Sequence, residues 1–400
     1  LRREIADHVR EAKSKFGRSP PERSSVRFFR FWPSAFRTFG QPPGTADALV
    51  RRGPDRANRE DQAAAVEDIT AALAIEPDRV EALVARGGAR AALGDLPGGL
   101  ADLTRALELD PRCSQAFVNR SFARHAQGDL EGAAGDLGRA LELRPGWTTA
   151  LNNRSAIRYE QGEFAGAIED ATRALEVDPS CATAWCYRGM AKMALGDGPG
   201  AIEDATRAVA CDPEFATAWA FRGSARTFTG DLAAAVEDLG RAIALAPTDP
   251  AHYESRGRAL RMAGDPAAAI DDYRRALGLA PGRATAWRDL ARAREESGDR
   301  PGAIADLDRA IELDPGFGPA RNDRGLLRLD QGDVAAAIDD FAAATRADAR
   351  LWEAWSNLAV SLDRTGRRTE AAQAVARAIE HAPAAERGRL EALRQQFEDR

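Results

Sequence analysis

The chain has 400 residues, of which 44% are hydrophobic and 30% are charged, and its formal net charge is −6. This composition is typical of a soluble folded protein and excludes the fibrous and membrane-spanning classes. No run of about 18 uncharged apolar residues occurs, and the N-terminus lacks the apolar core of a secretory signal, so we expect a cytoplasmic protein.

The first 45 residues differ in charge from the rest. They hold ten Lys or Arg and four Asp or Glu, a sum of +6, which leaves −12 for residues 46–400. Phosphate binding depends on clustered basic groups. The acidic remainder therefore argues against nucleic acid as the partner of the chain.

Residues 1–45 form a basic, aromatic-rich segment in which we expect a helix followed by a linker. One helix face carries Leu1, Ile5, Val9, Ala12 and Phe16. In residues 26–39, aromatic side chains alternate with arginines, a pattern that could dock on an anionic membrane surface or stack on single-stranded nucleic acid. We favour a simpler interpretation, in which the segment packs on the array that follows or links it to an upstream domain.

Three series of residues recur every 34 positions along the rest of the chain. The prolines are Pro77, Pro111, Pro145, Pro179, Pro213, Pro247, Pro281 and Pro315. The glycines are Gly94, Gly128, Gly162, Gly196, Gly230, Gly264, Gly298, Gly332 and Gly366. The alanines are Ala72, Ala106, Ala140, Ala174, Ala208, Ala242, Ala276, Ala310, Ala344 and Ala378. Three independent series with one period indicate an internal repeat.

The stretch 182–215 shows how one repeat is expected to fold. Residues spaced three and four apart from Trp185 to Lys192 share one helix face, and Gly196 ends that helix because glycine tolerates a left-handed conformation. A second helix runs from about Pro199 until Pro213 ends it. Each repeat is therefore a helical hairpin, and the fold class is all-α.

The pattern of bulky, small, Gly, Ala and Pro positions resembles the tetratricopeptide repeat family. The bulky position holds Leu83, Phe117, Leu151, Trp185, Trp219, Tyr253, Trp287, Arg321 and Trp355, where only Arg321 departs from the pattern. The small position holds Gly87, Ser121, Ser155, Gly189, Gly223, Gly257, Ala291, Gly325 and Ala359. The resemblance implies a right-handed α-solenoid superhelix of 34-residue helical hairpins, whose first helices line a concave surface that holds peptides.

The repeat register divides the chain into four parts. A degenerate first repeat occupies residues 46–79, where Gly53-Pro54 weakens the first helix. Nine repeats follow over residues 80–385. Residues 386–400 are expected to form a capping helix whose stripe of Leu390, Leu393 and Phe397 covers the apolar end of the stack.

Two charged ladders follow the same period. Arginine recurs as Arg86, Arg120, Arg154, Arg188, Arg222, Arg256 and Arg324, and aspartate recurs sixteen residues later as Asp102, Asp136, Asp170, Asp204, Asp238, Asp272, Asp306 and Asp340. A feature present in nearly every repeat marks packing rather than a binding site. We therefore expect structural ion pairs, within or between repeats.

The sequence predicts no catalytic residue, no metal site and no cofactor. The four cysteines lack the spacing of a zinc site or a disulfide framework, and the four histidines lie in separate repeats or in the ends of the chain. No nucleophile elbow and no glycine-rich phosphate loop occurs. The array is therefore not expected to be an enzyme.

The expected concave groove varies along the array, and its variable residues are the candidate peptide-binding site. The apolar candidates are Phe122, Tyr159, Cys186, Tyr187, Met190, Met193, Phe221 and Phe228. Arg258, Arg261, Arg288 and Arg292 form a basic stretch that could bind a carboxylate. Asn119 and Asn153 could hydrogen-bond a peptide backbone, as asparagines do in some relatives. The same side chains could instead be packing residues between helices.

Two functions fit these features. The first is a non-enzymatic scaffold that binds a peptide or protein segment in the groove. The second is the regulatory or substrate-docking region of a larger enzyme, such as a bacterial protein kinase or glycosyltransferase, with its catalytic domain upstream. A membrane-surface adaptor that uses residues 26–39 is a third, less favoured hypothesis. The sequence names neither the partner nor the oligomeric state.

Overall fold

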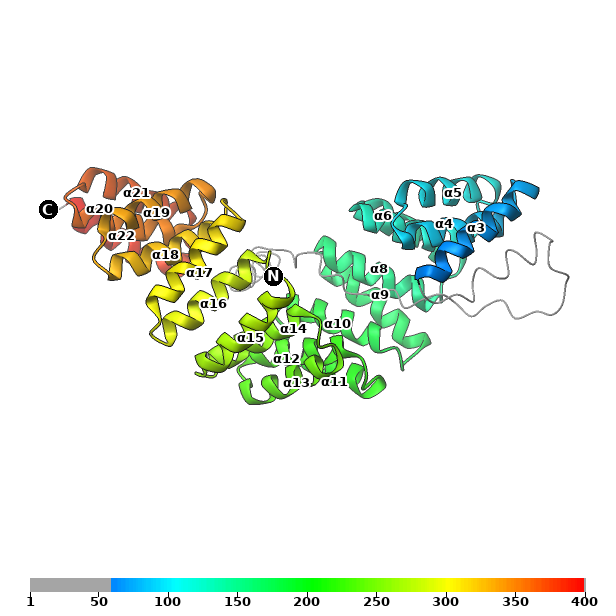
Figure 1. Cartoon of the computed structure of the whole chain (residues 1–400), viewed down its shortest axis with the longest axis horizontal. Helices are drawn as coiled ribbons and strands as arrows, with labels where there is room; N and C mark the ends of the chain where they lie inside the picture. Colours follow the sequence, from blue (N-terminus) through cyan, green and yellow to red (C-terminus); the bar gives the residue numbers. More distant parts are fainter. Residues whose placement is uncertain (1–58, 399–400) are drawn as a thin grey trace. The chain divides into compact units, whose positions relative to one another are not determined.

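A computed structural model describes residues 59–398, which contain α-helices joined by short turns and no strand (Figure 1). The chain divides into two compact units, residues 1–225 and 226–400. The basic segment 1–45 and residues 46–58 of the expected degenerate repeat lie outside the described residues.

Both units consist of consecutive helical hairpins. The first unit holds α3 (Arg59–Ile75), α4 (Val80–Leu93), α5 (Leu96–Leu109), α6 (Ser114–Gln127), α7 (Leu130–Leu143), α8 (Thr148–Gln161), α9 (Phe164–Val177), α10 (Ala182–Ala194), α11 (Gly198–Cys211) and most of α12 (Ala216–Thr229). The second unit begins in the last turn of α12 and holds α13 (Leu232–Leu245), α14 (Pro250–Met262), α15 (Pro266–Leu279), α16 (Ala284–Glu296), α17 (Arg300–Leu313), α18 (Gly318–Asp330), α19 (Val334–Ala347), α20 (Trp352–Arg364), α21 (Arg368–His381) and α22 (Ala384–Glu398). The fold is an all-α repeat solenoid, as the 34-residue period predicts.

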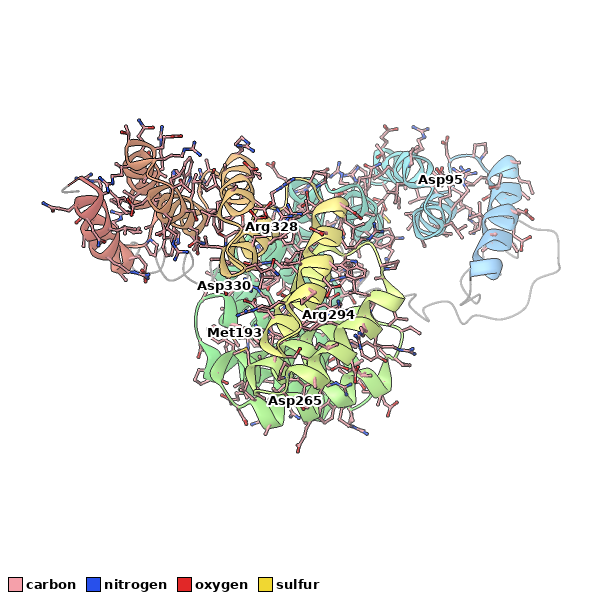
Figure 2. The ribbon with its side chains drawn as sticks, turned by 60° about the vertical axis from the view of Figure 1, so that its left-hand side comes forward. Asp95, Met193, Asp265, Arg294, Arg328 and Asp330 are labelled. Atoms are coloured by element: carbon pink, nitrogen blue, oxygen red, sulfur yellow. The ribbon has the colours of Figure 1, made fainter. Side chains whose placement is uncertain are left out.

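The recurring glycines form the turn inside each hairpin. All nine have a positive φ, from 76° at Gly366 to 96° at Gly94, a conformation that side chains with a Cβ rarely adopt. The aspartate that usually follows caps the second helix, as at Asp95, whose carboxylate accepts a 3.0 Å hydrogen bond from the Gly98 backbone N–H (Figure 2). Each such cap contributes about 1 kcal/mol.

The small position of each repeat lets the two helices of a hairpin touch. A Cβ added at Gly87 would lie 2.7 Å from Leu103 Cγ and 2.9 Å from the Gly99 carbonyl oxygen. At Gly325, an added Cβ would lie 2.6 Å from the ring of Phe341, which is fully buried. The expected close approach is confirmed, and the small residues belong to the core.

The bulky position of the first helix carries a hydrogen bond as well as apolar surface. Trp185 Nε1 donates to the carbonyl of Pro179, six residues earlier, at 2.9 Å. The same bond recurs from Trp219, Trp287 and Trp355, and Tyr253 makes it through its hydroxyl. Arg321, which departs from the sequence pattern, donates from Nη2 to the Pro315 carbonyl at 3.0 Å. It therefore replaces the tryptophan as donor at that junction.

The two charged ladders meet inside single repeats. Arg154 Nε and Nη2 donate to the two carboxylate oxygens of Asp170 at 2.8 and 2.6 Å. Arg158, one turn later on α8, adds a third bond at 2.8 Å, and Asp170 is fully buried. The sequence missed this second cation, although it recurs as Arg90, Arg124, Arg158, Lys192, Arg226, Arg294 and Arg328. The ladder is structural, as expected.

The seventh repeat breaks this arrangement. Leu290 stands where the sixth and eighth repeats place the bidentate arginines Arg256 and Arg324, so Asp306 is held only by Arg294 at 3.1 Å. Its Oδ2 is buried, and burial raises the pKa of the carboxyl from 3.8 to about 6. The buried aspartate of the seventh repeat is therefore less well compensated than Asp170 of the third repeat.

The last helix, α22, packs on α21 at the end of the second unit. Leu390 and Phe397 are buried in one cluster with Leu358, Leu362 and Val375, and Leu393 packs against it. This contact removes the apolar edge of the last hairpin from water.

Candidate functional site

Within each unit, some neighbouring first helices touch one another. In the first unit α4 contacts α6 and α8 contacts α10, and in the second unit α14 contacts α16 and α18 contacts α20. In each unit, we call the surface that its own first helices present the first-helix face of that unit. Every candidate site residue lies on a first helix, as the repeat register predicts.

In the first unit, the apolar candidates are more buried than the sequence indicated. Cys186 and Tyr187 are only 1% and 6% exposed, so they belong to the core of α10 rather than to a contact surface. Burial raises the pKa of the Tyr187 hydroxyl well above its ordinary value, as expected for a side chain removed from water. This burial favours the packing role that the sequence analysis kept as the alternative for these two residues.

The other apolar candidates of this unit are half-buried: Phe122, Tyr159, Met190, Met193 and Phe221. The Tyr159 ring packs on Phe164, with centroids 5.6 Å apart. An added Cβ at Gly189 would lie 2.7 Å from the Phe221 ring, so Phe221 fills the space that this glycine leaves. These side chains combine packing between helices with partial exposure.

The most exposed large apolar side chains of the first-helix face lie at the end of α12 and in the second unit. Phe228 is 41% exposed, Met262 50% and Leu326 39%. Sequence reasoning selected Phe228 but missed the other two. The period contained the signal, because Met262 lies 34 residues after Phe228 and Leu326 lies 34 residues after Arg292.

The two asparagine candidates are half-buried in the first unit. Asn119 accepts a hydrogen bond from Gln115 at 2.9 Å and donates to the Val84 carbonyl of the preceding first helix at 3.4 Å. The Nδ2 of Asn153 is buried, with no hydrogen-bond partner among the described residues. Asn119 thus joins two first helices, whereas the Nδ2 of Asn153 has a donor that no described residue accepts.

The four candidate arginines are paired with acidic side chains of the chain itself. Arg288 and Arg292 both donate to Asp323 Oδ2, at 2.6 and 3.0 Å, and so connect α16 to α18. Arg261 pairs with Glu296 on the next first helix. Arg258 makes the loosest contact, 3.6 Å to Asp289, and its side chain is 49% exposed. A carboxylate ligand would have to displace these partners, so the stretch is not a free cationic site.

A hollow of about 410 Å³ lies where the face meets the capping helix. Ser356, Asn357 and Val360 of α20 line one side, and Arg389 and Leu393 of α22 line the other. Asn357 Nδ2 donates to Asn322 Oδ1 at 2.9 Å, which joins α18 to α20. Both polar and apolar side chains line this hollow, which lies at the end of the first-helix face of the second unit.

The described residues hold no group of three or more His, Cys, Asp or Glu side chains arranged to bind a metal ion. Two histidines have acidic neighbours: His125 bonds to Glu160 at 2.9 Å, and the buried His252 lies 3.8 Å from Asp249. Burial lowers the pKa of His252. Within residues 59–398, every helix is too short or too polar to span a lipid bilayer.

These features define an all-α protein of nested hairpins whose surface chemistry lies on its first helices. The tetratricopeptide repeat model matches residues 89–146, 157–214, 188–250, 222–284, 254–316 and 322–386. The chain belongs to the tetratricopeptide repeat family. Proteins with this fold typically serve as non-catalytic scaffolds that mediate protein–protein interactions.

Solved structures show the same fold at low sequence identity. Yeast Tom70 is 14% identical over 88% of this chain and 95% of its own, with a TM-score of 0.50. A chain of the APC/C hetero-tetramer Cut9–Hcn1 is 17% identical in sequence, and the match covers 79% of this chain and 62% of that chain, with a TM-score of 0.55. A tetratricopeptide repeat protein from Parabacteroides merdae is 19% identical in sequence, and the match covers 62% of this chain and 98% of that chain, with a TM-score of 0.50. No curated protein matches the sequence.

Proposed function

We propose that the chain is a non-enzymatic, cytoplasmic scaffold that holds a segment of a partner protein on its first-helix face. The observation that carries the proposal is the exposure of Phe228, Met262 and Leu326 on first helices. Single exposed apolar residues are ordinary on protein surfaces. Phe228 and Met262, however, occupy the same position of successive repeats.

Sequence variation along the face supports the same proposal. The glycine turn, the small position and the buried aspartate recur in nearly every repeat because packing requires them. At the position of Arg258, the next two repeats have Arg292 and Leu326, and the earlier ones have Ser224, Met190, Ala156, Phe122 and Gly88. Packing does not dictate one residue type there, so this position is free to determine which partner binds.

The ion pairs between neighbouring first helices assign a different role to the basic residues. Arg288 and Arg292 stabilise the junction of α16 and α18 through Asp323. Arg258 is the one of the four candidates with a half-exposed side chain and only a long contact. We therefore propose apolar anchoring by Phe228, Met262 and Leu326, with Arg258 contributing a charged contact at the rim.

A pull-down from the native lysate tests this proposal. The double variant Phe228→Ser/Met262→Ser should lose the captured protein while its circular dichroism spectrum and melting temperature stay within error of the wild type. Val177→Ser is the matched control, because Val177 is 56% exposed on a second helix. Equal capture by the double variant, or equal loss with Val177→Ser, would refute binding on the first-helix face.

A further inference from the structure

His252 interrupts a series that is otherwise uniform along the stack. The third residue of the first helix is alanine in the other eight repeats, and each of these alanines is at most 1% exposed: Ala82, Ala116, Ala150, Ala184, Ala218, Ala286, Ala320 and Ala354. His252 occupies this position in the sixth repeat and is only 7% exposed. The fold therefore buries an imidazole ring where it elsewhere buries a methyl group.

The third position of a first helix faces the second helix of the preceding repeat. Ala286 shares a buried cluster with Leu277 of α15, and Ala320 shares one with Ala310 of α17. Because α13 packs on α14 in the same way, the register places His252 at the junction of these two helices. The ring therefore lies between two repeats and within the second unit.

The surroundings of the ring favour its neutral form. Burial lowers the pKa of His252 below its ordinary value of 6.5, and Asp249, whose Oδ2 lies 3.8 Å from Nε2, opposes this shift only in part. The first turn of α14 is also the positive end of the helix, which disfavours a cation there. The buried and half-buried carboxylates of α13 to α16 already face arginines, in the pairs Asp238–Arg226, Glu254–Arg283, Asp272–Arg256 and Asp289–Arg258. A protonated ring therefore has Asp249 as its acidic neighbour.

We infer that the junction of α13 and α14 is a pH-sensitive contact that loosens when His252 gains a proton. The folded chain holds this proton less tightly than the unfolded chain. The contribution of His252 to stability is therefore complete above pH 6.5 and is lost as pH falls below that value. Arg258 and Met262 lie on α14, so acidification weakens partner binding there, a consequence that rests on the proposed function.

Hydrogen exchange of the full chain without a partner tests the inference, whatever the first-helix face binds. In the wild type, the protection factors of the α13 and α14 amides, which remove the intrinsic pH dependence of exchange, should fall severalfold from pH 7.5 to 5.5. His252→Ala introduces the residue of the other repeats and should abolish this fall. His125→Ala is the matched control, because His125 is a partly exposed first-helix histidine bonded to Glu160, and it should keep the wild-type pH response in α13 and α14.

A second variant separates the charge of the ring from its size. His252→Gln keeps a polar side chain of similar length that takes no proton in this pH range, so its protection factors should also be independent of pH. Two results would overturn the inference. The first is a wild-type profile that does not change between pH 7.5 and 5.5. The second is a fall in His252→Ala or His252→Gln equal to that of the wild type, which would assign the response to other groups.

Discussion

The substitution Asp170→Asn probes the buried charge ladder at its most complete member. Asp170 is fully buried and accepts three N–H hydrogen bonds from Arg154 and Arg158. Asparagine keeps the volume but removes the charge, and it turns one acceptor into a donor that faces two guanidinium groups. Both arginines then lose their ionic partner in a site that is shielded from water.

The expected cost follows from that burial. Removing one partner of a buried ion pair costs about 3 to 5 kcal/mol. The side chains of Arg154 and Arg158 are 14% and 25% exposed, so they can regain some water, and we expect the lower end of the range. Asp306→Asn is the matched control, because Asp306 has a single cation at 3.1 Å and a pKa raised to about 6. Its replacement should cost about 1 kcal/mol or less at pH 7.

Hydrogen exchange measured helix by helix is the suitable assay, because repeat arrays do not unfold as one cooperative unit. A loss of about 3 kcal/mol corresponds to roughly 100-fold faster exchange of the protected amides in α9. The amides of α17 in Asp306→Asn should change by less than about tenfold. Equal effects in the two variants would refute the argument that the number of bonded cations sets the cost.

Three further predictions concern other parts of the stack. The raised pKa of Asp306 means that the folded chain holds its proton more tightly than the unfolded chain between pH 3.8 and about 6. The contribution of Asp306 to stability therefore falls as pH rises through that window. The protection of the α17 amides from hydrogen exchange in the wild type, relative to Asp306→Asn, should decline from pH 4 to 6.5. A difference that does not change with pH would count against a perturbed pKa of this carboxyl. Arg321→Leu should destabilise the α17–α18 junction by about 1 kcal/mol, because it removes the hydrogen bond to the Pro315 carbonyl. Arg321→Trp should retain the stability, as measured by hydrogen exchange in α18. Equal losses in the two variants would show that this hydrogen bond does not stabilise the junction. Ala276→Leu should cost about 1 to 3 kcal/mol, because Ala276 is fully buried between two helices, and an unchanged melting curve would contradict the close approach assigned to it.

Most of the fold could be predicted from the sequence because the same turn and helix signals recur in every repeat, so a weak signal in one repeat is supported by the others. One glycine is a weak turn signal, whereas nine in one register leave a single consistent hairpin, and all nine have the expected positive φ. The ion-pair ladder was predictable for the same reason. Arg321 was not, because only the structure shows that its guanidinium donates to the carbonyl that a tryptophan indole bonds elsewhere.

The candidate site could be predicted only in outline. The register assigned residues to first helices, but it could not tell how deeply each side chain lies. It therefore left open whether Tyr187 and Cys186 face a ligand or pack, and α10 buries both. It also could not pair charges across helices: Arg288 and Asp323 are 35 residues apart and meet only when two first helices pack together. Exposure at Met262 likewise depends on neighbours that the sequence does not reveal.

Site-specific photocrosslinking tests the central claim, that a partner segment lies on the first-helix face, most directly. A benzophenone side chain at Met262 or Leu326 should crosslink a partner protein in the native lysate, since both positions are exposed on first helices. The same probe at Val177 or Ile75, which are exposed at 56% and 61% at the ends of second helices, should give no such product. Crosslinks from Val177 and Ile75 with none from Met262 and Leu326 would contradict the account.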